Sequence, residues 1–271
     1  MPNILTRAIF GFVYIAIIIL ASLYSPMSLL ILLGLLLALC LWEIIQLLQF
    51  DNKFYILGTV LVSGYLFYTY AEKFWHSGGM YDIRLVNFLP PLLFLVALFI
   101  IFKRPIELSF DSSKLIFSVV YIALPFSLVL TTVKKFEIDN FMMLNSVICL
   151  FILLWCSDTF AYLTGKYFGS TKLSSISQNK TVEGLIGGMF FTIIAGILIN
   201  YNFENLRGNW IIISIIIAIV APFGDLAESK IKRVFGVKDS GKLLPGHGGF
   251  LDRLDSFLPA AVALYVYFLF I

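Results

Sequence analysis

Charged residues are concentrated in one stretch of this chain, from Asp225 to Asp255, with long apolar segments before and after it. The chain has 19 basic and 16 acidic residues, and 11 of them lie within these 31 positions: Asp225, Glu228, Lys230, Lys232, Arg233, Lys238, Asp239, Lys242, Asp252, Arg253 and Asp255. Carboxylates bind hard cations such as Mg²⁺, and lysine and arginine bind phosphate oxygens. The residue types therefore suit a site that holds a metal ion and an anion together.

Five residues of this stretch share one face of an expected helix. At positions i, i+3, i+4, i+7 and i+8 stand Asp225, Glu228, Ser229, Lys232 and Arg233. Asp225 follows an apolar run and is expected at or below the lipid surface, where an acid costs about 3 kcal/mol. The alternative is a helix end whose charged side chains pair with one another and reach the water. Pro222 and Gly224, just before Asp225, predict a local break in the helix.

Two further acids begin the last apolar segment. Asp252 and Asp255 stand three residues apart, after the run His247–Gly249. Glycines let a backbone approach a ligand closely, but acids are also ordinary residues in the first turn of a helix. Asp225 and Asp252 flank one polar loop and come from adjacent apolar segments. We therefore expect these two carboxylates to face each other and hold a cation.

Asp158 and the loop after it are the remaining candidates. Asp158 lies inside an apolar segment, where an acid indicates function unless a neighbouring helix satisfies it by hydrogen bonding. The loop, residues 166–183, contains Ser, Thr, Gly and Lys with a single acid, Glu183. Backbone amides near a helix N-terminus together with lysine suit phosphate. Composition alone fits an ordinary polar loop equally well.

The elements that must position these residues are membrane-spanning helices. The chain is 60% hydrophobic and 13% charged, with a mean hydropathy of +0.97, whereas soluble domains have roughly 25% charged residues. A spanning helix needs about 20 mostly apolar residues. We expect an all-α polytopic membrane protein with about nine transmembrane helices, at 8–24, 27–49, 54–71, 85–102, 115–132, 141–164, 184–201, 210–229 and 254–271. They form one membrane domain, 1–271, with N-terminal helices in 1–140 and the catalytic helices and loops in 141–271.

The distribution of Lys and Arg predicts the orientation. If the N-terminus and every second loop lie on one side, that side holds 14 of the 19 basic residues and the other side holds 5. Cytoplasmic loops carry the excess of Lys and Arg. We therefore expect a cytoplasmic N-terminus, with the polar loops 166–183 and 230–253 together on the cytoplasmic face. The expected location is a bacterial inner membrane, with the active site facing the cytoplasm.

A longer pattern within the charged stretch resembles the signature of the phosphatidate cytidylyltransferase (CDP-diacylglycerol synthase) family. It reads Ser229-x-Ile231-Lys232-Arg233-x4-Lys238-Asp239-x-Gly241-x2-Leu244-Pro245-x-His247-Gly248-Gly249-Phe250-x-Asp252-Arg253-Leu254-Asp255. Two earlier segments resemble further family blocks, Asp158-x2-Ala161-Tyr162-x2-Gly165 and Lys180-Thr181-x-Glu183-Gly184. One departure is Gln178 after Ser177, where relatives usually have proline. The resemblance covers residues 150–271, and the N-terminal half is similar in hydropathy and length only.

This resemblance implies transfer of CMP from CTP to phosphatidic acid, giving CDP-diacylglycerol and pyrophosphate. It implies Mg²⁺ as cofactor at Asp225 and Asp252, with a second cation as an option. The catalytic residues it implies are Asp225, Asp252, Lys180, Lys238 and Asp239. The substrate-binding residues it implies are Ser229, Lys232, Arg233, His247, Gly248, Gly249, Arg253, Asp255, Asp158 and Glu183. The partners are the two substrates and the lipid bilayer, with no nucleic acid; a homodimer is compatible with it.

Two alternatives stay open. One is a secondary transporter whose membrane acids bind ions, but such proteins show repeated halves with broken helices near the midplane, whereas charge here gathers at one face of one half. The other is a cytidylyltransferase that acts on another lipid phosphate, such as an ether lipid or a polyprenol phosphate, which the signature does not distinguish.

Overall fold

The computed structural model describes residues 4–77, 85–103, 108–133, 145–174, 180–203, 206–241 and 248–271. Within these ranges the chain is helical, apart from one isolated antiparallel bridge between Lys172 and Thr181. The elements are α1 (Ile4–Tyr24), α2 (Pro26–Leu48), α3 (Lys53–Ser77), η1 (Leu85–Phe88), α4 (Leu89–Lys103), α5 (Asp111–Ser118), η2 (Val119–Ala123), α6 (Leu124–Leu130), α8 (Ser146–Phe168), α9 (Val182–Asn202), α10 (Trp210–Val234), α11 (Leu251–Leu254) and α12 (Phe257–Leu269).

Seven of the expected spans are helices long and apolar enough to cross a membrane. They are Pro26–Leu48, Lys53–Trp75, Val86–Lys103, Asp111–Leu130, Ser146–Phe168, Val182–Asn202 and Trp210–Val234. The first expected span lies in α1, which contributes a shorter apolar helix, Gly11–Tyr24. The last expected span, 254–271, contains the 13-residue α12, which follows α11 and rises only about 20 Å. The prediction of an all-α, multi-pass membrane protein is confirmed, although the last helix is shorter than expected.

Local signals account for where the helices begin. Ser25 caps α2 by accepting from Ser28 N, and Pro26 occupies the first turn, where its missing N–H is not needed. Thr181 caps α9 by accepting from Gly184 N at 3.1 Å. Asn209 caps α10 in the same way. These caps fix the residues at which α9 and α10 begin, and both helices contribute to the site described below.

Two of the prolines inside the expected spans, Pro125 and Pro222, have different outcomes. Pro125 follows a π-helical segment, η2, in which the N–H of Leu124 bonds to the carbonyl of Val119. A widened turn is a common response where a helix must accommodate a local irregularity. Pro222, by contrast, lies within α10, which continues from Trp210 to Val234. The break expected at Pro222–Gly224 is therefore absent, and the prediction was wrong.

Gly224 allows close packing instead. A Cβ atom added there would lie 2.2 Å from the carbonyl oxygen of Asp255 and 2.7 Å from Pro259 Cγ. Only a residue without a side chain lets α10 approach the junction of α11 and α12 this closely. Gly224 thereby brings the Asp225 turn against the Asp255 segment.

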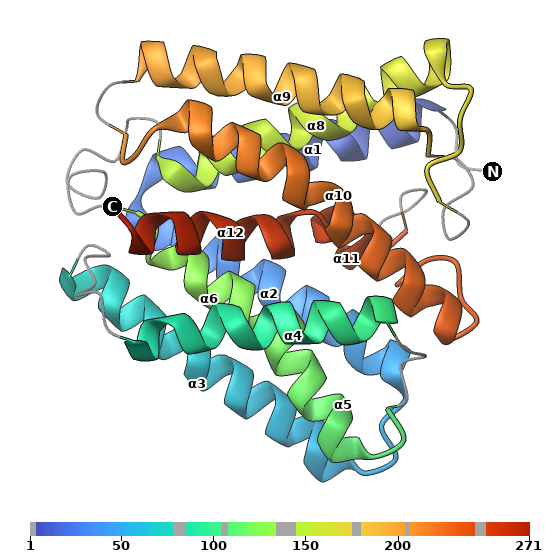
Figure 1. Ribbon diagram of the computed structural model, residues 1–271. Helices are drawn as coiled ribbons and strands as arrows, with labels where there is room; N and C mark the ends of the chain where they lie inside the picture. The colour runs from blue at the N-terminus through green and yellow to red at the C-terminus, as the bar shows by residue number, and fades with distance from the viewer. Residues whose placement is uncertain are drawn as a thin grey trace.

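The helices lie side by side with roughly parallel axes (Figure 1). α8 packs against α9, α9 against α10, α10 against α12, and α12 against α6. Glycines make the α8–α9 contact close, because a Cβ at Gly184 would lie 2.7 Å from Ala161 O and one at Gly188 would lie 2.9 Å from Ser157 O. This contact sets the segment around Asp158 directly against the start of α9.

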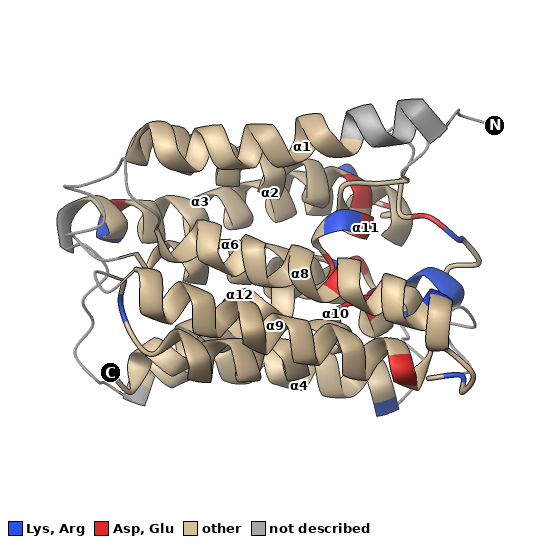
Figure 2. Ribbon diagram, turned by 90° about the horizontal axis from the view of Figure 1, so that it is seen from above, with Lys and Arg blue, Asp and Glu red and all other residues tan. Residues whose placement is uncertain are grey.

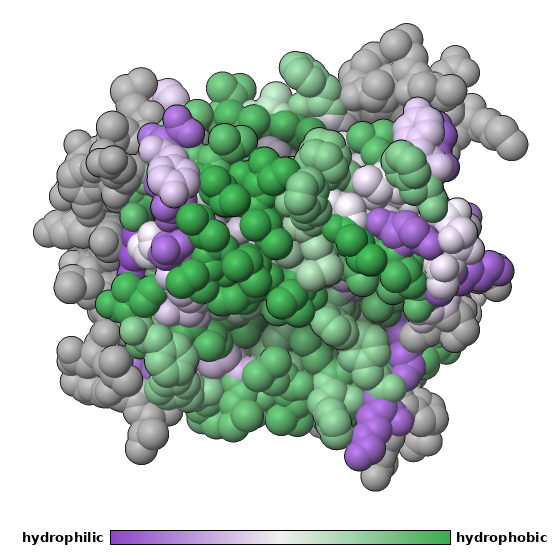
Figure 3. Space-filling view, turned by 45° about the horizontal axis from the view of Figure 1, so that its top comes forward, coloured by the Kyte–Doolittle hydropathy of each residue, from purple (hydrophilic) through white to green (hydrophobic). Residues whose placement is uncertain are grey.

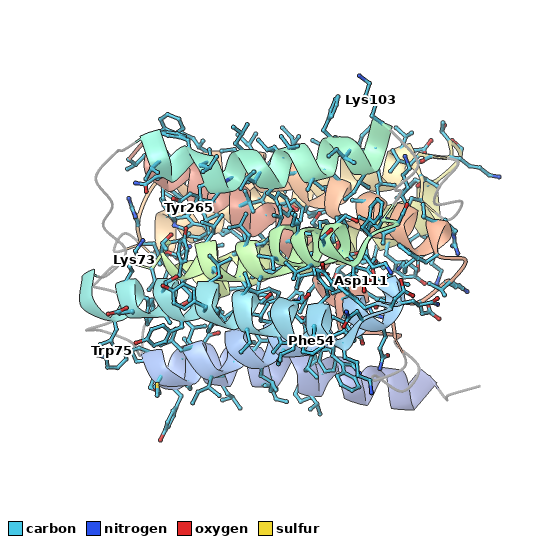
Figure 4. All side chains as sticks on the ribbon, turned by 90° about the horizontal axis from the view of Figure 1, so that it is seen from below. Phe54, Lys73, Trp75, Lys103, Asp111 and Tyr265 are labelled. Carbon is cyan, nitrogen blue, oxygen red and sulfur yellow. The ribbon has the colours of Figure 1, made fainter. Side chains whose placement is uncertain are left out.

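Charged residues gather at one end of the bundle. Figure 2 shows Lys, Arg, Asp and Glu around α11 and the neighbouring ends of α8 and α10, at the end where the N-terminus lies, while the C-terminus lies at the other end. A broad hydrophobic surface separates the two polar ends (Figure 3). Lys73 and Trp75 lie at the end opposite to Lys103 and Asp111 (Figure 4). The expected grouping of the loops is visible, and the choice of which end faces the cytoplasm stays a prediction.

Candidate active site

A cavity of about 610 Å³ lies at the charged end, where α8, α9, α10 and α11 meet. Its acidic lining residues are Asp158, Asp225, Glu228, Asp252 and Asp255. Its basic lining residues are Lys166, Lys180, Lys232 and Arg253. The two polar loops expected to build one site therefore both contribute to it, and Asp225 and Asp252 both line it. That these two carboxylates face each other across a cation stays a prediction.

α10 supplies Asp225, Glu228 and Lys232 to the cavity lining, whereas Ser229 lies outside the lining. The Ser229 hydroxyl donates to Asp225 Oδ1 at 3.4 Å, one helical turn away. Lys232 Nζ donates to Glu228 Oε2 at 2.8 Å, again across one turn. The helical spacing expected from the sequence is therefore present, and Lys232 connects this face of α10 to Asp252 of α11.

Lys232 joins α10 to α11. Its ammonium group donates to Asp252 Oδ1 at 2.5 Å as well as to Glu228. The other carboxylate oxygen of Asp252 accepts from Gly249 N at 2.7 Å and from Ser240 N at 3.1 Å. Burial raises the pKa of Asp252, but the hydrogen bonds from Lys232 and Gly249 lower this pKa by more than burial raises it. The pKa of Asp252 therefore lies below its ordinary value. Asp252 is therefore an ionised carboxylate held from two sides.

Lys180 joins the segment before α9 to α10. Its ammonium group forms an ion pair with Asp225 Oδ2. The bridge between Lys172 and Thr181 and the cap at Thr181 hold the chain on both sides of this lysine. Burial lowers the pKa of Lys180 further than Asp255 and Asp158 raise it. The site thus holds a lysine that loses its proton more readily than one in water.

Glu228 has a different environment from the other acids. Its side chain is 1% exposed, and Oε1 has no hydrogen-bond partner among the residues that the structure describes. The sequence placed Glu228 on the α10 stripe but assigned it no role. A buried carboxylate oxygen beside a cavity can bind a cation or a hydrogen-bond donor of a ligand. Among the described residues, no group of three or more His, Cys, Asp or Glu side chains forms a ligand cluster by itself.

Several predicted residues lie outside the cavity lining. Arg233 is exposed and donates to Val237 O at 3.2 Å, at the end of α10. Lys238 and Asp239 are exposed on the loop that follows. Glu183 is partly exposed and accepts from Ser170 Oγ at 2.6 Å, so it holds the loop and does not line the cavity. The roles assigned to these residues stay predictions.

Three further predicted residues, Asp255, Gly248 and Gly249, lie near Asp252. Asp255 is buried, lines the cavity and accepts from Ser256 N at 2.6 Å. Gly248 has a φ of +82°, which L side chains rarely adopt. Gly249 donates its N–H to Asp252. His247 lies outside the described residues.

Sequence reasoning missed Glu43 of α2. This side chain is 1% exposed and accepts hydrogen bonds from Ser240 Oγ, Phe250 N and Leu251 N, each at 2.9 Å. The signal was present, because an acid inside an apolar span indicates function by default. The same rule singled out Asp158, but it was not applied to the N-terminal half.

Comparison with known proteins identifies the family of this chain. The model of the cytidylyltransferase family matches residues 5–271. A phosphatidate cytidylyltransferase of Staphylococcus aureus (strain COL) is 36% identical over 186 residues, which is 68% of this chain and 69% of the relative. Proteins of the same name from Staphylococcus haemolyticus and Brucella abortus biovar 1 are 45% and 42% identical over 118 and 126 residues, covering 42% and 45% of this chain and 45% and 46% of the relatives. Because the family model matches nearly the whole of this chain, the chain belongs to the cytidylyltransferase family.

Proposed function

We propose that this chain transfers the CMP group of CTP to the phosphate of phosphatidic acid, giving CDP-diacylglycerol and pyrophosphate. The relatives above carry the name of that activity. The observation that carries the proposal is the convergence of Lys180, Asp225, Lys232 and Asp252 on one cavity, because they come from three separate segments.

The chemistry explains the residue types. A phosphate oxygen of phosphatidic acid attacks the α-phosphorus of CTP, the bond from that phosphorus to the bridging oxygen breaks, and pyrophosphate leaves with the electron pair. The attacking oxygen is already an anion, so no general base is required. The main obstacle is repulsion between two anionic substrates, which positive charge reduces. Lys180, Lys232 and Arg253 line the cavity and supply that charge.

The acids of the cavity fit a divalent cation, which we propose is Mg²⁺. Asp225 and Asp252 offer carboxylate oxygens, and Glu228 Oε1 is buried beside them without a partner. Such hard oxygen ligands suit Mg²⁺, which usually takes one or two carboxylates together with substrate phosphates. When bound, the ion would neutralise phosphate charge and orient the reacting groups.

The present ion pairs hold these residues in place for substrates. Lys180 pairs with Asp225, and Lys232 pairs with Glu228 and Asp252. Phosphate oxygens compete with the carboxylates for the lysines, and a cation competes with the lysines for the carboxylates. Exchange of partners therefore keeps every buried charge neutralised while both substrates bind.

We place the cavity at the cytoplasmic face of a bacterial inner membrane. The excess of Lys and Arg on this side, 14 against 5, supports the orientation. CTP is soluble and phosphatidic acid is anchored in the bilayer, so the site must be reached from both. A cavity at the end of a membrane bundle meets that requirement.

The test is pyrophosphate release by the purified protein in lipid nanodiscs. We expect release from CTP only when phosphatidic acid and Mg²⁺ are both present, with CDP-diacylglycerol recovered in equal amount. ATP, GTP and UTP test base choice, and polyprenol phosphate and an ether-lipid phosphate test the lipid. Movement of label across vesicles without consumption of CTP would refute the proposal in favour of a transporter.

A further inference from the structure

Glu43 is a buried acid from the N-terminal half of the chain that touches the signature segment. Oε1 accepts from Phe250 N, and Oε2 accepts from Leu251 N and from Ser240 Oγ, all at 2.9 Å. The side chain is 1% exposed, in the last turns of α2. A buried carboxylate with hydrogen bonds on both oxygens is held in one orientation.

Two glycines of the signature close around this carboxylate. A Cβ atom added at Gly241 would lie 2.4 Å from Glu43 Oε1, and one added at Gly249 would lie 2.3 Å from Oε2. Any side chain at either position would displace Glu43 or the loop. The shape of the loop and the position of Glu43 therefore depend on each other.

The groups that hold Glu43 also hold Asp252. Ser240 donates its hydroxyl to Glu43 and its N–H to Asp252 Oδ2. Three consecutive N–H groups are divided between the two acids, with Gly249 N bonded to Asp252 and the next two bonded to Glu43. A change at Glu43 is therefore transmitted to Asp252 through two separate peptide segments.

We propose that Glu43 is a positioning residue for the reaction, which fixes Asp252 in the cavity by holding the Ser240 and Gly249–Leu251 segments. This role rests on the proposed function, since Asp252 is one of its cation ligands. Glu43 itself does not line the cavity. The N-terminal helices thus contribute to the site through a hydrogen-bonded acid, although the signature lies wholly in the C-terminal half.

Replacement by glutamine separates positioning from packing. Glu43→Gln keeps the size of the side chain but replaces one oxygen with an NH₂ group. Whichever way the amide is turned, one buried backbone N–H then faces a second donor. Residues that orient a ligand of a metal typically change affinity or activity by about 10- to 100-fold when replaced. We expect a loss of that size in kcat, with a higher Mg²⁺ concentration needed for half-maximal rate.

The matched control is Cys40→Ala. Cys40 is buried one turn earlier on α2, and this variant also perturbs the helix core without touching the loop. Wild type, both variants and Asp252→Asn are compared in nanodiscs by CMP transfer over a Mg²⁺ series and by Mn²⁺ binding followed by electron paramagnetic resonance. We expect weaker Mn²⁺ binding, by about tenfold, for Glu43→Gln, no tight binding for Asp252→Asn, and wild-type behaviour for Cys40→Ala.

Glu43→Gln with the same Mg²⁺ dependence, Mn²⁺ affinity and kcat as Cys40→Ala would overturn the positioning role, even if its melting temperature fell. If Glu43→Gln does not fold, Ser240→Ala replaces it, because this change removes one donor from Glu43 and should raise the Mg²⁺ requirement; an unchanged requirement would also overturn the proposal. A wild-type protein that binds Mn²⁺ but does not transfer CMP would refute the proposed function alone. Absence of both would remove the basis for both proposals.

Discussion

The ion pairs of Lys232 allow us to predict how much stability the protein loses when the ammonium group is removed. Lys232 has a side chain that is 11% exposed and bonds to Glu228 at 2.8 Å and to Asp252 at 2.5 Å. Lys232→Met keeps most of the apolar stem and removes the ammonium group. Asp252 would keep its two backbone donors, but Glu228 would lose the ammonium group that donates to its Oε2.

The magnitude follows from the burial of Glu228. Its side chain is 1% exposed, and an uncompensated buried charge left after removal of one partner costs about 3–5 kcal/mol. For a chain of this size, roughly 2–4 °C of melting temperature corresponds to each kcal/mol, so we expect melting to fall by about 6–20 °C. The double variant Glu228→Gln/Lys232→Met removes both charges and should recover all but about 1–2 kcal/mol.

The assay is thermal unfolding in mild detergent, followed by tryptophan fluorescence. Lys230→Met is the matched control, because Lys230 lies on the same helix, is more exposed and donates to a backbone carbonyl, Phe102 O. Its effect should be about 0.5–1 kcal/mol. If Lys232→Met melts within a degree of Lys230→Met, or if the double variant is less stable than Lys232→Met, the buried pair does not stabilise the fold as we reason.

Three further predictions test the site. Asp225→Asn and Asp252→Asn should each abolish CMP transfer while the protein still folds in the membrane, and near-normal turnover in either would refute the metal assignment. Burial lowers the pKa of Lys180, so activity should decline at a lower pH than it would with an ordinary lysine. The free energy of unfolding should rise with pH between the folded-state pKa of Lys180 and 10.5, because the unfolded chain binds more protons in that range. Lys180→Arg should shift the alkaline decline to higher pH, and an unshifted pH–rate profile would count against the role of this lysine. Gly224→Ala should destabilise the protein by about 1–3 kcal/mol, measured by melting, because the new Cβ would lie 2.2 Å from the Asp255 carbonyl oxygen.

The sequence was sufficient to predict much of the fold. Runs of about 20 apolar residues predict spans because a lipid-facing backbone must satisfy its own hydrogen bonds. The two exceptions have physical causes. α10 continues through Pro222, and the regular helix of the last span begins only at Phe257. The residues from Asp252 to Ser256 are mostly polar, but hydropathy averaged over about 20 residues does not locate the first residue of the helix.

Side-chain pairing was the part of the site that the sequence did not reveal. Helical spacing placed Asp225 and Lys232 on one face, but spacing does not indicate that Lys232 bonds to Asp252 or that Lys180 bonds to Asp225. Those contacts join residues 20 and 45 positions apart in the numbering. Arg233 shares the helical face of Lys232 by spacing, but its guanidinium donates to Val237 O at the helix end. The role in substrate binding that the family resemblance implies for Arg233 stays a prediction.

The pairs that join distant segments also account for how this bundle tolerates its charges. Each buried acid or base would be costly alone in a membrane protein, but Lys180–Asp225 joins the start of α9 to α10 and Lys232–Asp252 joins α10 to α11. Glu43 adds α2 to the same assembly through the backbone beside Asp252. The contacts that neutralise the charges are therefore the contacts that assemble the cavity. Loss of one member should disturb both stability and the position of the remaining ligands, whereas loss of an exposed residue such as Lys238 should affect neither the fold nor the geometry of Asp252.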